Sequence, residues 1–203
     1  MNTPSIRIDV RGLAEASGQL QTLRKGLADR RPLHATLAVE AQNFTRDYVA
    51  RSSRHATAQR LGAAPTGFRQ RSATRIEGAS DADAAIIRIP RNTGLGRAFS
   101  DITLRPGSGR KYLTIPAAAE TYGKAVRDFP QESFAFTVAG GRYPALVWRE
   151  AGGTHQAGAV AYWLRLEVHQ KQDRTLLPTD AAYQEIGRER AQLYIASLIY
   201  RAA

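Results

Sequence analysis

The stretch Val160-Ala-Tyr-Trp-Leu-Arg-Leu-Glu-Val-His169 contains the strongest strand signal in the chain. Its aromatic and aliphatic side chains are the types that a pleated, half-buried surface accommodates best. The sequence therefore predicts one β-strand over Val160–His169. A strand with this much apolar surface is not stable alone, so we expect it to belong to a sheet built with the segments that precede it.

Several segments upstream have the composition of strands. Phe134–Val138 and Ala145–Trp148 flank the connection Ala139-Gly-Gly-Arg-Tyr-Pro144, which predicts a β-hairpin. Arg105-Pro-Gly-Ser-Gly-Arg-Lys111 predicts a basic turn, and Ala151–Gly158 predicts a second, flexible tip. The other expected strands are Ala84–Ile89, Phe99–Arg105 and Tyr112–Ile115, with Met1–Val10 as a short strand or extended arm.

Three segments show the apolar spacing of helices. Four leucines at positions 13, 20, 23 and 27 predict a first helix over about Leu13–Leu27, and a second follows over about Leu33–Arg51. We expect these two helices to pack on each other or on a sheet. Thr179 is a good N-cap for a last helix that runs to about Tyr200.

These elements predict an α+β fold with N-terminal helices, an antiparallel β-sheet of four or more strands with long loops, and a C-terminal helix. The chain has 203 residues, a length that favours a single domain. Within it we expect an N-terminal helical arm over about 1–51, a flexible basic loop over about 52–73, the sheet over about 74–170, and the last helix over about 179–201.

The composition narrows the classes of partner. The net charge is +11 and 43% of the residues are hydrophobic, so we expect a folded protein that meets polyanions such as DNA or an acidic protein surface. No apolar run approaches the roughly 18 residues of a membrane span, and the first residues lack the apolar core of a secretory signal. We therefore expect no membrane contact and assembly in the cytoplasm.

The positive charge is concentrated in two segments. Between Arg51 and Arg75 the chain has six arginines and no acidic residue, and the turn at Arg105–Lys111 adds three cations. Both segments suit contact with a phosphate backbone or with carboxylates, because arginine makes forked contacts with either group. The alternative is a pair of solvated loops without a partner. The candidate contact residues are Arg54, Arg60, Arg69, Arg71, Arg105, Arg110 and Lys111.

No catalytic or metal-binding motif is recognisable in the sequence. The four histidines lack the spacings of zinc motifs, although His155 and His169 could meet across a hairpin. The turn ending at Lys111 is not a phosphate loop, since Tyr112 stands where Ser or Thr would bind magnesium. The chain has no cysteine, which excludes disulfides and thiolate ligands. We expect no enzyme activity, cofactor or metal, and keep an enzyme with a dispersed site as a third hypothesis.

Four short signatures stand out in the second half of the chain. They are Lys111-Tyr-Leu-Thr-Ile-Pro116, Thr121-Tyr-Gly-Lys124 with Asp128-Phe129, Tyr162-Trp-Leu164, and Arg174-Thr-Leu-Leu-Pro-Thr179. As ordinary structure, their apolar residues fill the core of the sheet and anchor the last helix. Together with the order of the elements, they resemble the Mu-like virion morphogenesis family of tailed phages, whose members complete tails and join heads to tails.

The resemblance implies a structural protein of the virion neck or tail top, which completes the tail and joins it to the DNA-filled head as a ring subunit. The implied partners are copies of itself in a six-fold ring, the adjoining neck and tail proteins (connector or stopper, tail terminator or tube), and genomic double-stranded DNA in the channel. The alternative from composition is a non-specific double-stranded-DNA-binding protein that acts outside the virion.

Overall fold

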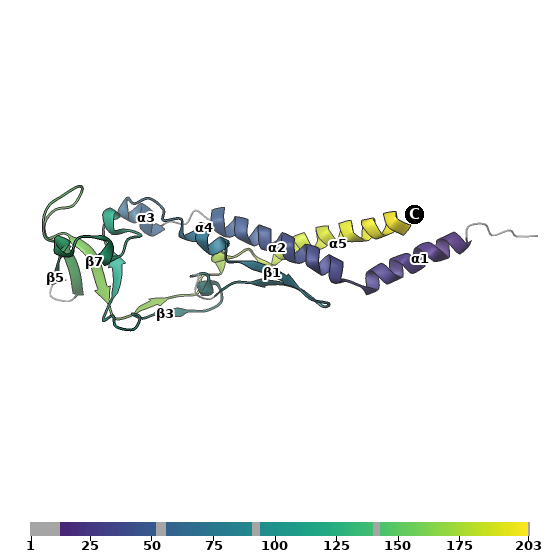
Figure 1. The fold of residues 1–203 in the computed structure, drawn as a ribbon, viewed down its shortest axis with the longest axis horizontal. Helices are drawn as coiled ribbons and strands as arrows, with labels where there is room; N and C mark the ends of the chain where they lie inside the picture. The colour runs from purple at the N-terminus through teal and green to yellow at the C-terminus, as the bar shows by residue number, and fades with distance from the viewer. Residues whose placement is uncertain (1–12, 52–55, 91–93, 140–142, 203) are drawn as a thin grey trace, which may run out of the picture. The chain divides into compact units, whose positions relative to one another are not determined.

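The computed structural model describes residues 13–51, 56–90, 94–139 and 143–202, and the expected strand or arm at Met1–Val10 lies outside them. Its elements make the α+β fold that the sequence predicts, with helices toward both ends of the chain and antiparallel sheets of two to four strands (Figure 1). The chain divides into two compact units. The single domain over 1–203 stays a prediction.

Unit 1 comprises Met1–Thr45, Ile76–Arg88 and Pro178–Ala203, and unit 2 comprises Arg46–Arg75 and Ile89–Leu177. The expected helices are confirmed as α1 (Leu13–Ala28), α2 (Arg31–Arg51) and α5 (Asp180–Ala202). Thr179 is the N-cap of α5, because its Oγ1 accepts a hydrogen bond of 3.3 Å from the backbone N–H of Ala182.

In unit 1, α1 packs against α5. The Tyr194 hydroxyl donates to the carbonyl oxygens of Gly26, at 2.9 Å, and Asp29, at 3.1 Å. Gly26 permits this approach, since a Cβ there would overlap the Leu198 side chain. Large apolar side chains of both helices remain exposed; they are Leu20, Leu27, Leu193, Ile195, Ile199 and Tyr200.

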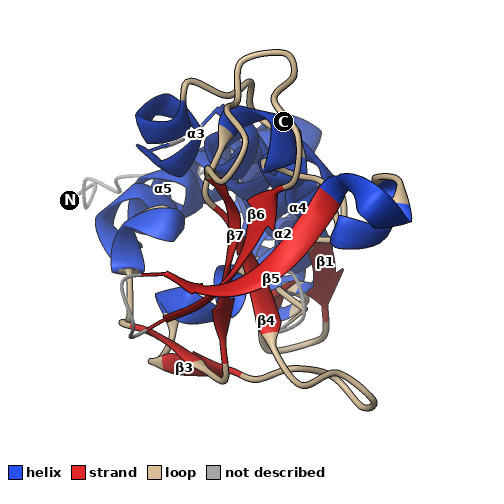
Figure 2. Ribbon diagram, turned by 90° about the vertical axis from the view of Figure 1, so that its left-hand side faces the viewer, coloured by secondary structure: helices blue, strands red, loops and turns tan. Residues whose placement is uncertain are grey.

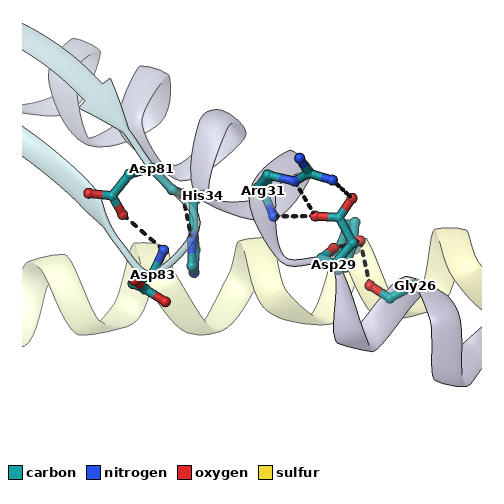
Figure 3. Close-up of polar contacts among 7 residues, drawn as sticks. Gly26, Asp29, Arg31, His34, Asp81 and Asp83 are labelled. Atoms are coloured by element: carbon teal, nitrogen blue, oxygen red, sulfur yellow. Dashed lines mark hydrogen bonds and ion pairs between the residues drawn. The ribbon is translucent and has the colours of Figure 1, made fainter.

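A short hairpin of β1 (Glu77–Ser80) and β2 (Ala85–Arg88) completes unit 1. Asp81 holds its turn by accepting hydrogen bonds from the backbone N–H groups of Asp83, at 2.9 Å, and Ala84, at 2.8 Å. The same two N–H groups lower the pKa of Asp81. Figure 3 shows the His34 ring of α2 beside this turn, where its Nδ1 lies 3.2 Å from the Asp81 carbonyl oxygen.

The sequence did not predict β1, because Glu-Gly-Ala-Ser has little intrinsic preference for a strand. Tertiary contacts hold it instead. The Gln42 side chain accepts a hydrogen bond from the N–H of Gly78, and a Cβ on Gly78 would collide with the Ala38 carbonyl group. The close approach of α2 therefore requires a glycine at this position of the strand.

Unit 2 contains the four-stranded sheet. Its order is β4 (Leu113–Pro116), β7 (Val160–Arg165), β6 (Tyr143–Trp148) and β5 (Phe134–Ala139), with every neighbouring pair antiparallel (Figure 2). The predicted β5–β6 hairpin and the predicted strand at Tyr112–Ile115 are confirmed, with small shifts at their ends. Among the described residues, β4 and β5 are the two edge strands of this sheet, and each pairs with a neighbour on one side only.

An aromatic cluster on one face of this sheet forms the core of unit 2. Phe134, Trp148 and Tyr162 are buried, and Phe129 packs against all three rings. The Tyr162 hydroxyl donates to the Lys124 carbonyl oxygen at 3.1 Å, and burial raises the pKa of Tyr162 to about 12. The apolar signature around Tyr162 is therefore part of the core.

The single strand predicted over Val160–His169 is wrong. β7 ends at Arg165, and after Leu166 and Glu167 the chain forms β8 (Val168–Gln170), which pairs with β3 (Ile102–Leu104) in a separate two-stranded sheet. Leu166 is 65% exposed, so its place in a continuous apolar run does not mean that it is buried. The pairing partner decides where each strand ends, and local composition cannot reveal this.

The predicted strand over Phe99–Arg105 is confirmed only as β3. The residues before it form the 3-10 helix η2 (Leu95–Ala98), which Phe99 closes with a 3.1 Å hydrogen bond from its N–H to the Gly96 carbonyl oxygen. Similar single turns punctuate the rest of unit 2; they are η3 (Ala119–Thr121), η4 (Val126–Asp128), η5 (Gln131–Ser133) and η6 (Arg174–Leu176).

The prediction of a loop over 52–73 is wrong for most of the segment. It contains two short helices, α3 (Ala56–Leu61) and α4 (Phe68–Ala73). Ala58 and Ala73 are buried, so each helix turns a small residue into the protein although the segment has no apolar periodicity. Helices of six residues are not stable alone, and only this packing explains them.

Candidate polyanion-binding surface

The excess positive charge of the chain belongs to unit 2. Unit 1 has ten basic and ten acidic residues and is neutral, whereas unit 2 has nineteen basic and eight acidic residues. The whole net charge of +11 therefore falls in the unit that holds the four-stranded sheet. A net charge of +11 attracts polyanions, and this charge is confined to one of the two units.

The first group of candidate residues lies on the two short helices. Arg60 belongs to α3 and its side chain is exposed. Arg69 and Arg71 belong to α4, where the Arg71 guanidinium donates to the Thr66 carbonyl oxygen at 2.8 Å and Arg69 is half-buried. Arg54 lies outside the described residues. Of this group, Arg60 is thus the residue best placed to meet a partner without giving up an internal contact.

The second group lies on the turn between β3 and β4. The predicted turn is confirmed: Gly109 has φ +76°, and the Arg110 N–H donates a hydrogen bond of 3.1 Å to the Gly107 carbonyl oxygen. The side chains of Arg110 and Lys111 are exposed, and the Lys111 ammonium lies 5.4 Å from the Tyr112 ring centre. The glycines let the turn present two adjacent cations to solvent.

Arg105 forms an ion pair with another residue of the chain at the surface. Its Nε lies 3.4 Å from Oε2 of Glu167, and the other carboxylate oxygen of Glu167 lies 3.1 Å from the His169 ring. His169 and then Arg105 lower the pKa of Glu167. Contact with a partner would compete with this pairing, so Arg105 is a weaker candidate than Arg110 or Lys111.

The structure does not unite the two groups in one patch. In the views of Figures 1 and 2, α3 lies above the four-stranded sheet and β3 lies below it. Sequence reasoning also passed over other exposed cations of unit 2, namely Lys124, Arg127, Arg149, Lys171 and Arg174. They are scattered singly along the chain, and only the division into units shows that they add to the same charged body.

Three aspartate side chains of unit 2 accept hydrogen bonds from backbone N–H groups. Asp101 accepts a hydrogen bond from the Gln172 N–H at 2.7 Å, Asp128 from the Ala125 N–H at 2.7 Å, and Asp173 from the Thr175 N–H at 3.1 Å. Asp128 and Asp173 thus each hold a local turn, whereas Asp101 joins the residue before β3 to a residue that follows β8. In the described ranges no three histidine or acidic side chains come close enough to hold a metal ion.

His155 and His169 lie in different surroundings. The His169 ring makes a hydrogen bond with the Thr103 hydroxyl. The His155 ring instead stacks on the Trp148 ring, with ring centres 3.7 Å apart and ring planes inclined by 13°. Nδ1 of His155 lies 3.6 Å from Oε1 of Glu120. No sequence signal marked this cluster, because Glu120 and His155 are far apart in the chain. It joins the turn at 151–158 to the core.

Glu120 makes stability depend on pH. The Thr154 hydroxyl, a backbone N–H and His155 hold its pKa below the ordinary value of 4.5, with Thr154 contributing most. This stabilisation is therefore complete above about pH 4.5 and is lost as the pH falls through the lowered pKa. We expect Thr154→Val to lower the free energy of unfolding by on the order of 1 kcal/mol at pH 7, and by less at pH 3.

Urea unfolding at pH 7, 5 and 3 measures this difference. Thr154→Ser is the control, because it keeps the hydroxyl and should follow the parent protein at each pH. A loss in Thr154→Val that is the same at pH 3 and pH 7 would show that the methyl packing, and not the hydrogen bond to Glu120, explains the effect.

Comparisons with protein-family models, with curated proteins and with solved structures return no match to this chain. Among the described residues, none of the helices combines the length and the apolar content needed to cross a membrane.

Proposed function

We propose that this chain is a structural subunit of a tailed-phage neck, which completes the tail and joins it to the DNA-filled head as part of a ring. The proposal starts from the four sequence signatures and from the order of the elements. The α+β architecture that the family resemblance implies is present, with α2, a basic segment, a sheet and α5 in that order.

The observation that carries the proposal is the contrast between the two units. Unit 2 holds the entire net charge of +11, whereas unit 1 is neutral and exposes large apolar side chains on α1 and α5. Exposed apolar helix faces suit contacts with other proteins, and a basic body suits a polyanion. A subunit that links protein rings around a DNA channel needs both kinds of surface.

Electron microscopy of phage particles tests the proposal. In lysates of the parent phage or prophage that lacks this gene, we expect filled heads and tails of finished length that are not joined. A plasmid copy of the gene should restore joined particles. Normal joined particles in the deletion lysate would overturn the proposal.

A second candidate is non-specific binding to double-stranded DNA outside a virion. The confinement of the net charge to unit 2 favours DNA binding as much as it favours the neck subunit, since phosphate contacts need no further motif. It predicts normal particles from the deletion together with DNA binding that weakens linearly in log salt. The microscopy experiment therefore separates the two candidates.

A further inference from the structure

β5 is an edge strand without the usual protection of an edge. Its sequence, Phe134-Ala-Phe-Thr-Val-Ala139, contains no charge, proline or glycine. Edge strands of soluble proteins commonly carry such residues, because open backbone groups otherwise pair with another chain. The opposite edge strand, β4, carries Pro116, which has no N–H to offer. The two edges of the sheet therefore differ in their readiness to pair.

The register of the hairpin shows which backbone groups of β5 face outward. Val138 lies opposite Pro144, which has no N–H, and the Arg149 N–H bonds the Ser133 carbonyl oxygen at 3.1 Å. Both observations show that Ala135 and Thr137 belong to the hydrogen-bonded pairs of the ladder between β5 and β6. Phe134, Phe136 and Val138 therefore direct their N–H and C=O groups away from β6.

One of these outward groups is occupied. The Arg149 side chain donates from Nε to the Phe134 carbonyl oxygen at 3.0 Å. Within the described residues, the outward N–H and C=O groups of Phe136 and Val138 have no such partner. The side chains of Phe136 and Val138 are 60% and 48% exposed, on the same face as buried Phe134. Backbone and side chains are thus both open along one short segment.

We propose that β5 pairs with β5 of a second copy about a two-fold axis at Thr137. Antiparallel pairing in this register places Phe136 of each copy opposite Val138 of the other. The two free N–H and two free C=O groups of each strand then form four hydrogen bonds, while Arg149 keeps its bond to Phe134. An aromatic ring meets a β-branched side chain twice, and the two Thr137 side chains face each other.

This contact goes beyond the proposed function. A two-fold interface closes at two copies, so it forms a dimer in solution with a continuous eight-stranded sheet, and it is not the contact that closes a ring. The dimer covers an apolar edge that no described strand covers within one copy. It gives the subunit a protected form before it meets its other partners.

Cysteine cross-linking tests the pairing directly, because the parent chain has no cysteine. Thr137→Cys should form a covalent dimer with itself on mild oxidation, since opposite residues of a non-bonded pair have their Cβ atoms about 5 Å apart. Thr114→Cys, on the other edge strand, is the matched control and should stay monomeric on a denaturing gel. A folded Thr137→Cys protein that gives no covalent dimer overturns the proposal. So does a dimer that forms only when the two variants are mixed, because β5 then pairs with β4.

Sedimentation of the full chain provides a second test. Phe136→Lys should weaken dimerisation by about 100-fold or more, since it buries a charge in the centre of the contact. The side chain of Phe99 is 61% exposed, which is nearly the same as that of Phe136, so Phe99→Lys is the control. It should change the dissociation constant of the dimer by less than about threefold. A parent protein that is monomeric at all concentrations, or equal effects of both variants, would overturn the proposal. Neither experiment depends on phage particles, so a failure here leaves the proposed function standing.

Discussion

Replacing Tyr162 with alanine is expected to lower the free energy of unfolding by about 4 kcal/mol, near the top of the range for large-to-small core changes. The side chain is 0% exposed, and its ring lies edge-on to Phe134 with centres 5.6 Å apart. Tyr162 belongs to β7, which lies between β4 and β6 in the four-stranded sheet. The cavity would open beneath the middle of the sheet, where the surrounding elements cannot easily collapse into it.

Urea unfolding followed by near-ultraviolet circular dichroism measures this loss. Tyr162→Phe keeps the ring and removes only the hydrogen bond to the Lys124 carbonyl oxygen, so it should cost about 1 kcal/mol. Equal losses in the two variants would contradict the prediction, since they would place the stabilisation in the hydroxyl. Because domains are stable by only about 5–15 kcal/mol, the alanine variant should be partly unfolded in mild denaturant.

Reversing the charge of three exposed cations of unit 2 should largely abolish binding to a DNA duplex. Arg60, Arg110 and Lys111 are chosen because their side chains are exposed, whereas Arg71 and Arg105 hold internal partners. We expect the triple glutamate variant to bind at least about 100-fold more weakly. The slope of log affinity against log salt should fall by about 2, since one duplex can meet the adjacent Arg110 and Lys111 but not α3 on the other side of the sheet, and each lost phosphate contact removes about 0.9.

The matched control reverses three exposed cations of unit 1, Arg24, Arg30 and Arg201. Both triple variants change the net charge by the same amount, so a difference between them locates the binding surface. We expect the unit 1 variant to lose affinity by less than about tenfold. Equal losses would show that only total charge matters, and parent binding that ignores salt would refute phosphate contact altogether. Fluorescence anisotropy of a labelled duplex at several salt concentrations reports both quantities.

Sequence patterns predicted most of the regular structure because those elements have strong local signals. The three long helices follow from apolar spacing, and the N-cap at Thr179 follows from its hydroxyl. The β5–β6 hairpin and the glycine-rich turn follow from local turn chemistry. In each case the residues that make the interaction are close together in the chain.

The errors concern elements that depend on distant partners. α3 and α4 each bury a small residue, Ala58 and Ala73, and no apolar periodicity in the sequence predicts this. β1 forms because Gly78 admits the backbone of α2. For the candidate binding surface, the sequence identified Arg60, Arg110 and Lys111 as cations. Their exposure, and the internal contacts of Arg71 and Arg105, required coordinates.

The sequence by itself determined the α+β class, the long helices, the hairpin and the excess of positive charge, since these depend on composition and on short-range spacing. Only the tertiary structure decided that the apolar run from Val160 to His169 is divided between two sheets and that β5 is left at an edge. It also showed that the net charge belongs to one unit. The physical reason is that strand pairing and compact packing join residues far apart in the chain, and their free energy outweighs local preference.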